Sequence, residues 1–212
     1  MTIKSRLQIW SIGLSAIVIF MVTFAATAVA RAAIDPGYNW FYNFHSGLCV
    51  SVPGSSTTSG KQLWQDPCVN DKNFGWDPIT GFDGTQYVIR NDNSKMCMAV
   101  QNDSTTSGAP IVQQGCSNLS NPATDERFVI TQAGFYNGYG WAVYESNHSG
   151  YCITISGGSE ANGAYLVQGS CGSRSSWFVF VAPGTSMPCP CTSAVNAHSA
   201  PESPVPPMRR EK

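Results

Sequence analysis

Short segments in which apolar and polar residues alternate recur along the chain about every ten residues, and turn residues such as Gly, Asn, Ser and Pro bound each of them. A period of two is typical of a β-strand, because successive side chains of a strand point to opposite faces. The pattern predicts twelve strands in three groups of four: 40–43, 48–52, 61–65 and 74–78; 85–90, 96–100, 109–114 and 127–131; 141–145, 151–155, 164–168 and 177–181. Four short strands repeated three times predict an all-β, barrel-like domain.

The three groups share further positions. Each contains one cysteine pair of the same separation: Cys49 and Cys68, Cys97 and Cys116, Cys152 and Cys171. A glycine follows each first cysteine at a fixed distance, and a glutamine stands three positions before each second one: Gly60, Gly108 and Gly163; Gln65, Gln113 and Gln168. Because several positions agree on one alignment, we infer a threefold internal repeat within a domain at 33–183, with units at about 36–82, 83–134 and 135–183.

The N-terminus resembles a secretory signal peptide. Lys4 and Arg6 precede an apolar run, and small residues that suit a signal peptidase follow it, with cleavage after Ala30 or Ala32. A retained membrane anchor is the alternative, since the run is nearly long enough to span a bilayer. We expect residues 1–32 to be removed, and the mature protein to be secreted, extracellular and free of the membrane.

Export would place the cysteines in an oxidising compartment, where evenly spaced pairs form disulfides. Equal spacing in all three units favours one bridge within each unit, Cys49 to Cys68, Cys97 to Cys116 and Cys152 to Cys171. A zinc site would need Cys or His residues closer together than the repeats provide. We therefore expect three structural disulfides and no metal or other cofactor.

The same alternation predicts the core. In the second strand of each unit one set of residues should face inward: Val50 and Val52, Met98 and Val100, Ile153 and Ile155. The cysteines, with Ser51, Ala99 and Thr154, should face the other way. An aromatic residue stands near the start of each last strand, and three such rings around a threefold axis would fill a barrel: Trp76, Phe128 and Trp177.

The composition excludes some classes of binding partner. The formal net charge is −1 and only 12% of residues are charged, so the chain lacks the basic field that binding to nucleic acid or anionic membrane requires. A surface of uncharged polar residues and aromatics suits a neutral, hydroxyl-rich ligand.

The strand pattern stops near Gly184. Residues 184–212 are rich in proline and poor in apolar side chains, which predicts a disordered tail that folding does not need. The tail contains Cys189 and Cys191, separated by one proline. An intermolecular disulfide, a metal site and a strained local pair are all compatible with this arrangement.

HisSerGly-x-Cys occurs at 45–49 and again at 148–152, and a strand, a Ser/Thr/Gly turn, Gln-x-x-Cys and a closing Trp follow. This order of motifs resembles that of the ricin B-type lectin family, also called R-type or QxW β-trefoils, over roughly residues 36–182. The resemblance implies a β-trefoil of three four-stranded units, each with a shallow sugar pocket, and a carbohydrate-binding module whose partners are glycans.

The sugar-binding residues of that family are only partly present. The resemblance implies an Asp two positions after the first cysteine, where this chain has Ser51, Ala99 and Thr154. It implies a stacking aromatic two positions before the second cysteine, where this chain has Asp66, Gln114 and Gly169. The polar residue of its AsnGln-x-Trp motif corresponds to Asn73, Asp125 and Arg174, so the first unit alone keeps the asparagine.

Unit one nevertheless has other residues that suit these sugar-binding roles. Trp64 and Asp66 are two apart on one strand and so share a face. A sugar needs an aromatic platform and a few polar groups that fix its hydroxyls, and we predict a site of Ser51, Trp64, Gln65, Asp66 and Asn73. In the alternative, Trp64 only packs over the disulfide and Asp66 starts a turn.

We expect no enzymatic activity. His45 and His148 occupy the same turn of two repeats, which should hold them apart, and His198 is in the tail. No motif supports paired-carboxylate chemistry. The competing interpretation is a secreted β-trefoil that binds protein, such as a protease inhibitor or surface ligand, through the aromatic, glycine-rich stretch 135–141.

Overall fold

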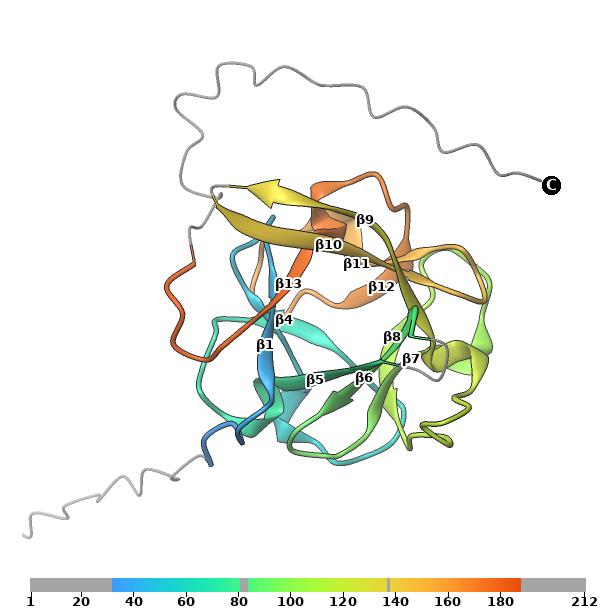
Figure 1. The fold of residues 1–212 in the computed structure, drawn as a ribbon, viewed down its shortest axis with the longest axis horizontal. Coiled ribbons are helices and arrows are strands. Elements are labelled where there is room, and N and C mark those ends of the chain that lie inside the picture. The colour runs from blue at the N-terminus through green and yellow to red at the C-terminus, as the bar shows by residue number, and fades with distance from the viewer. Residues whose placement is uncertain (1–31, 81–83, 137, 188–212) are drawn as a thin grey trace, which may run out of the picture. The chain divides into compact units, whose positions relative to one another are not determined.

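The computed structural model describes residues 32–80, 84–136 and 138–187 (Figure 1). All of them lie in the unit Arg31–Lys212. The predicted signal peptide falls outside the described residues except for Ala32, and so do Cys189 and Cys191. Within the described residues, no helix is long and apolar enough to cross a membrane.

The described chain is all β, with short 3-10 turns and no α-helix in these ranges. The strands of unit one are β1 (Asn39–Asn43), β2 (Cys49–Ser51), β3 (Lys61–Gln62), β4 (Trp64–Asp66) and β5 (Gly75–Thr80). Those of unit two are β6 (Gln86–Asn91), β7 (Cys97–Val100), β8 (Ile111–Gln114) and β9 (Phe128–Tyr136). Those of unit three are β10 (Tyr139–Ser146), β11 (Cys152–Ile155), β12 (Leu166–Gly169) and β13 (Phe178–Val181). All twelve predicted strands are confirmed; β3 and β4 are one predicted strand, interrupted at Leu63.

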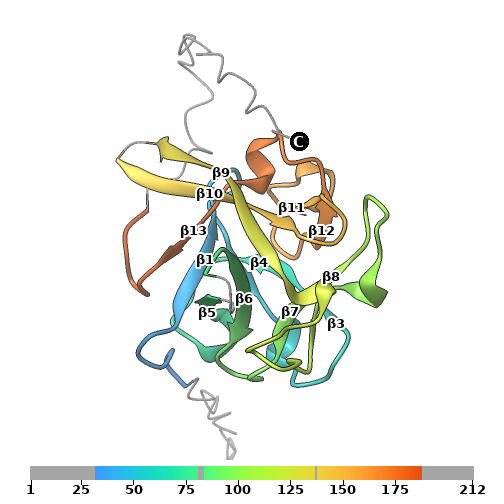
Figure 2. The ribbon, with the colours of Figure 1, turned by 45° about the vertical axis from the view of Figure 1, so that its right-hand side comes forward.

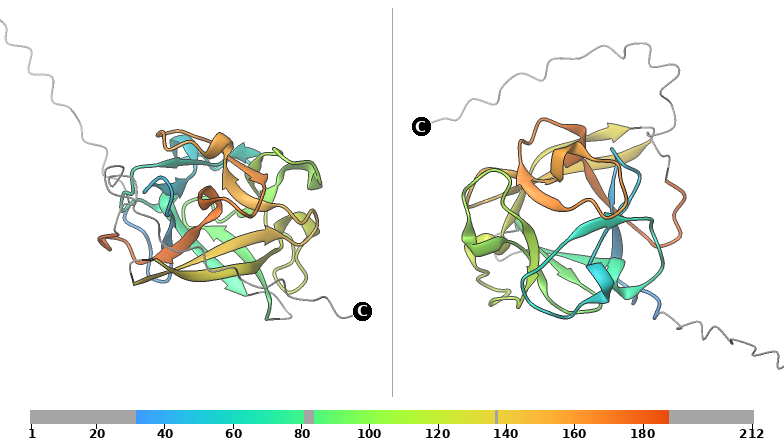
Figure 3. Two further views of the ribbon diagram at one scale, coloured as in Figure 1. Left: turned by 90° about the horizontal axis from the view of Figure 1, so that it is seen from above. Right: turned by 180° about the vertical axis from the view of Figure 1, so that it is seen from behind.

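The pairs are antiparallel and join the units in a circle. β5 pairs with β6, β9 with β10, and β13 with β1, so each unit is hydrogen-bonded to both of the others. Three lobes surround one axis, in blue-green, green-yellow and orange (Figure 3, right). The hairpin of β9 and β10 is the longest in the fold and reaches beyond the rest of the barrel (Figure 2). The structure is a β-trefoil.

The predicted core faces are confirmed. The six aliphatic side chains of β2, β7 and β11 and their flanks are at most 1% exposed, as are Trp76 and Phe128. Trp177 was expected to be the third aromatic plug, and this is wrong: Phe178 fills that place and is fully buried. Trp177 lies outside the barrel and stacks on Trp141, with ring centroids 4.1 Å apart.

The cause is a register shift of one residue in unit three. A 3-10 turn precedes the closing strand in each unit: η2 (Lys72–Phe74), η4 (Thr124–Glu126) and η6 (Arg174–Ser176). The buried aromatic follows the central residue of each turn by three positions. The structural equivalent of Asn73 and Asp125 is therefore Ser175, and the alignment of Arg174 with them is wrong.

The predicted disulfide pairing is confirmed in all three units. Each bridge spans 19 positions and joins Cα atoms 4.9 to 5.0 Å apart. The first cysteine of each pair is fully buried. Closing a loop of this length stabilises the fold by about 3 kcal/mol in the chain-entropy model, and this stabilisation is spread evenly over the three units.

A buried glutamine ties each unit to the next one around the axis. Gln65, Gln113 and Gln168 have no exposed surface. Each Oε1 accepts a hydrogen bond of 2.7 to 2.8 Å from a serine in the first hairpin of its own unit: Ser46, Ser94 and Ser149. Each Nε2 donates to two backbone carbonyls of another unit: Ser159 and Ala161, Ser56 and Thr58, Ser104 and Thr106. Unit one thus holds unit three, unit two holds unit one, and unit three holds unit two.

Removing one of these amides should loosen the whole barrel. We expect Gln168→Ala to lower the free energy of unfolding by about 2 to 4 kcal/mol, because it leaves a cavity and removes the hydrogen-bond partner of three partly buried groups. Gln132→Ala, on the exposed face of β9, is the matched control and should change it by less than about 0.5 kcal/mol. Urea unfolding with the disulfides intact measures both values. Equal effects of the two substitutions would contradict the role of the buried amide.

The described chain keeps contact with the barrel for four residues beyond the predicted domain end at 183. Thr185 N donates to the Ala182 carbonyl at 3.1 Å, the Tyr139 hydroxyl donates to the Ser186 carbonyl at 3.2 Å, and Met187 packs against a cluster of buried aromatics.

A chain ending at Met187 should therefore melt at the temperature of the full mature protein. A chain ending at Pro183 should lose about 1 to 2 kcal/mol, because it gives up the apolar contacts of Met187. Thermal unfolding of both truncated proteins distinguishes the two ends. A large loss of stability in the Met187 protein would show that the fold depends on residues 188–212.

Candidate functional site

The predicted site residues of unit one lie on two neighbouring strands. β2 and β4 pair so that Ser51 stands opposite Trp64 and Cys49 opposite Asp66. The Trp64 Nε1–H donates to Ser51 Oγ at 2.8 Å. Ser51 is fully buried, whereas Trp64 and Asp66 are partly exposed. Ser51 therefore fixes the indole from below, and the exposed edge of the face consists of Trp64 and Asp66.

Asn73 comes to the same region from η2. Its Nδ2 donates to the Val52 carbonyl at 3.2 Å, and its own carbonyl accepts from Val52 N at 3.2 Å. Since the amide nitrogen faces a carbonyl, the remaining polar atom of the side chain is Oδ1. The Asn73 side chain is 5% exposed, and Oδ1 has no hydrogen-bond partner. A buried acceptor left unpaired costs about 1 to 3 kcal/mol, which a donor able to reach this atom would relieve.

The equivalent positions of the other two units are closed by their own side chains. In unit two, Gln114 Nε2 donates to Asp125 Oδ2 at 2.7 Å. In unit three, the hydroxyls of Thr154 and Ser175 lie 2.8 Å apart, and Ser173 lies 2.6 Å from Ser175. Unit one alone leaves its acceptor open.

The contact in unit two also locates Asp66. Gln114 and Asp125 are the equivalents of Asp66 and Asn73, so the pseudo-threefold relation puts Asp66 and Asn73 on the same side of unit one. In the described part of the chain no protein group donates to the Asp66 carboxylate within hydrogen-bonding distance. Asp66 thus offers a partly exposed acceptor on the same strand face as the Trp64 ring, which suits a hydroxyl donor, whereas Asn73 Oδ1 is an unpaired acceptor buried in the same unit.

Gln65 does not share this face. Its side chain is the one that holds unit three, and both hydrogens of its amide are used there. It lies between Trp64 and Asp66 in the sequence but points to the opposite side of the strand. Its contribution to the predicted site is to hold β4 in place.

One neighbour of the site was missed from the sequence. Trp64 forms an isolated antiparallel bridge with Tyr165 of unit three, and a Cβ built on Gly163 would lie 3.5 Å from Trp64 Cε3. The repeat alignment could have revealed Tyr165, because it occupies the position of Gln62 and Pro110, where the other units have no aromatic residue.

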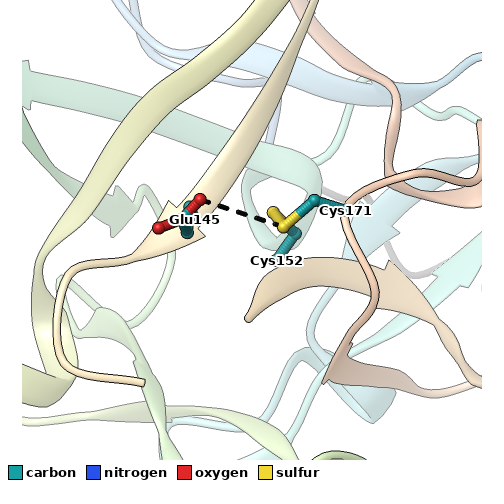
Figure 4. Close-up of side chains that lie close together, drawn as sticks. All are labelled: Glu145, Cys152 and Cys171. Atoms are coloured by element: carbon teal, nitrogen blue, oxygen red, sulfur yellow. Dashed lines mark hydrogen bonds between the residues drawn. A yellow bond between two sulfur atoms is a disulfide. The ribbon is translucent and has the colours of Figure 1, made fainter. Parts of the chain in front are cut away.

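Two other clusters contain side chains that can bind metals or transfer protons. Glu145 Oε2 lies 4.0 Å from Cys171 Sγ, beside Cys152 (Figure 4). Both sulfurs are joined in a disulfide, so they are not the thiolates that bind a metal. His45 lies 2.9 Å from the Gly158 carbonyl and His148 lies 3.6 Å from Asp103. The two histidines thus lie at different boundaries between units, which we call seams: His45 where unit one meets unit three, and His148 where unit three meets unit two. Their places in the repeat predicted that they would be apart.

The β9–β10 hairpin carries the aromatic surface that the competing interpretation requires. Phe135 is 84% exposed and borders an apolar pocket of about 410 Å³ that Trp141, Tyr144 and Phe180 help to line. Burial raises the pKa of the Tyr144 hydroxyl, which therefore stays neutral. A Cβ on Gly134 would lie 2.8 Å from Trp141, so only glycine lets this indole rest on the hairpin.

Comparison with known proteins supports the fold and its class. Residues 27–114 match the family described as "Ricin-type beta-trefoil lectin domain-like", which confirms the resemblance expected from the repeats. No curated protein matches the chain by sequence. The chain thus has a β-trefoil fold, and its residues 27–114 are similar to ricin-type lectin-like domains.

Several solved structures share this fold. ThreeFoil, a designed 3-fold symmetric protein, is 23% identical, with a TM-score of 0.61 over 68% of this chain and 98% of its own. An exo-β-1,3-galactanase from Clostridium thermocellum is 20% identical, with a TM-score of 0.61 over 72% of this chain and 32% of its own. The C-half of the earthworm R-type lectin, in complex with GalNAc, is 11% identical, with a TM-score of 0.51 over 69% of this chain and 98% of its own. At these identities the likeness establishes the fold alone.

Proposed function

We propose that this protein is a secreted, non-catalytic carbohydrate-binding module whose ligand site lies in unit one. The single observation that carries the proposal is the side-chain oxygen of Asn73, an acceptor that has no hydrogen-bond partner. In units two and three the matching side chains satisfy one another, whereas Asn73 Oδ1 is buried without a partner. A sugar hydroxyl that donates to Asn73 Oδ1 would supply the missing hydrogen bond.

The proposed roles follow from the geometry. Trp64 is the stacking platform, because its ring is partly exposed and its nitrogen is held by Ser51. The apolar face of a sugar ring packs on such a ring while its hydroxyls reach the polar groups at the edge. Asp66 and Asn73 accept from those hydroxyls. Ser51 and Gln65 act by positioning Trp64 and its strand.

A binding role without catalysis is supported by the separation of the titratable groups. Glycoside hydrolysis needs two carboxyl groups on either side of the scissile bond, and the proposed site of Ser51, Trp64, Gln65, Asp66 and Asn73 contains one carboxylate. The family match describes a lectin-like domain, which agrees with this assignment.

The second candidate function is protein binding through the β9–β10 hairpin. The observation that favours it is the exposure of Phe135, the most exposed large apolar side chain of the described residues. Exposed aromatics on a rigid hairpin are common in protein-recognition surfaces. A protease inhibitor or a surface ligand would use this hairpin and leave the unit-one face free.

The two functions can be separated by substitution. We expect Asp66→Asn and Trp64→Ala to abolish retention on a glycan array, the first because it replaces one of the two acceptor oxygens of the carboxylate with an amide donor and removes the charge, the second because it removes the platform. Phe135→Ala is the matched control for loss of an exposed ring and should retain glycans as the unaltered protein does. Trp64→Ala should cost about 1 to 2 kcal/mol of stability, which thermal unfolding measures.

Asp66→Asn keeps the test decisive if Trp64→Ala fails to fold. Glycan retention that survives both substitutions, or that is lost only in Phe135→Ala, would place the ligand outside unit one. Enrichment of a single protein by the unaltered chain but not by Phe135→Ala would favour the second candidate.

Binding at one such site should be weak. A shallow pocket recovers only a few kcal/mol after the cost of association, so we expect a Kd of about 1 mM for a monosaccharide by titration calorimetry. Retention on a dense glycan surface would then depend on multivalent display, for which an intermolecular disulfide through Cys189 or Cys191 offers a route.

Replacing both tail cysteines with serine should accordingly leave the calorimetric Kd unchanged and reduce retention on the dense surface. Tight monovalent binding, in the micromolar range or better, would contradict a shallow site.

A further inference from the structure

The exposed face of unit one continues into unit three. Trp64 and Tyr165 are directly opposite one another in an antiparallel bridge, so their side chains point to the same side with Cβ atoms about 4.5 to 5.5 Å apart. Tyr165 is 48% exposed and Trp64 is partly exposed. Two aromatic side chains from different units thus stand next to each other on one surface.

The seam under these two rings is rigid. Gln65 N donates to the Ala164 carbonyl at 2.9 Å and Gly163 N donates to the Gln65 carbonyl at 2.8 Å. The Gln65 side chain ties the preceding turn of unit three to the same strand. Because Trp64 and Tyr165 directly flank these contacts, the backbone that carries the two rings is ordered before any ligand arrives, which lowers the entropic cost of binding.

The other two seams lack such a pair. The equivalent bridges join Val167 to Pro110 and Val112 to Gln62. Val112 is 1% exposed, and the Gln62 amide donates to the Leu166 carbonyl. The double aromatic platform therefore occurs at one seam of the three, and this seam adjoins the unit whose polar acceptor is open.

We propose that the site takes a neutral oligosaccharide chain of at least two sugars that crosses the seam from unit one to unit three. This inference rests on the proposed function of unit one. One sugar stacks on Trp64 and donates hydroxyls to Asp66 and Asn73, and the next sugar stacks on Tyr165. The ligand is neutral because the Asp66 carboxylate, which has no cation beside it, would repel a uronate or a sulfate in the first subsite.

The test measures how affinity depends on chain length. The probes are ladders of β-1,3-galacto-, cello-, xylo- and chito-oligosaccharides of one to four sugars, titrated against the mature protein by calorimetry. At least one ladder should gain about tenfold in affinity between the first and second sugar, as one added aromatic stacking contact provides. Tyr165→Ala should remove that gain and leave the monosaccharide Kd unchanged. Tyr165→Phe keeps the ring and should keep the gain, and Phe135→Ala is the control for a remote exposed ring.

The outcomes separate the two proposals. Equal affinity for all lengths, or a gain that survives Tyr165→Ala, overturns the seam site and leaves the unit-one site standing. Binding of every length that survives Trp64→Ala and Asp66→Asn overturns the unit-one site, and the seam site with it. Failure of all four ladders to bind the unaltered protein overturns both.

Discussion

Each unit of this barrel is held by a buried amide that belongs to a neighbour. One glutamine per unit donates to two carbonyls of the adjacent unit and accepts from a serine of its own hairpin. A buried primary amide must find partners for both hydrogens and its oxygen, and here those partners come from two units at once. The three units therefore hold one another in place around the axis.

The threefold repeat makes the departures from symmetry informative. Three equivalent polar positions meet at the exposed end of the second strand and the 3-10 turn, and in two units the side chains pair with each other. In unit one the equivalent residues are Asp66 and Asn73, and there the Asn73 amide donates to the Val52 carbonyl while its Oδ1 has no partner. The asymmetry is a consequence of residue type, and it turns one unit of the three into a place for hydroxyl donors.

The outer faces of the three seams also differ from one another. Three equivalent bridges differ only in the side chains that they carry, and one of them brings Trp64 next to Tyr165. The hairpin of β9 and β10 departs from symmetry in another way, by extending past the barrel with Phe135 exposed. The two features lie on different elements, so a glycan site and a protein-binding surface could exist on one domain without competing.

The sequence by itself determined the strands, the core faces and the disulfides, because alternation and cysteine spacing are local patterns repeated three times. Its repeat alignment failed by one residue at Trp177, where the loop before η6 differs in length and only packing shows that Phe178 enters the barrel. It correctly placed Trp64 and Asp66 on one face, yet the burial of Gln65 and the contact with Tyr165 were decided by tertiary structure. Both depend on which unit stands beside which, and hydrogen-bond satisfaction across a seam leaves no periodic trace in the chain.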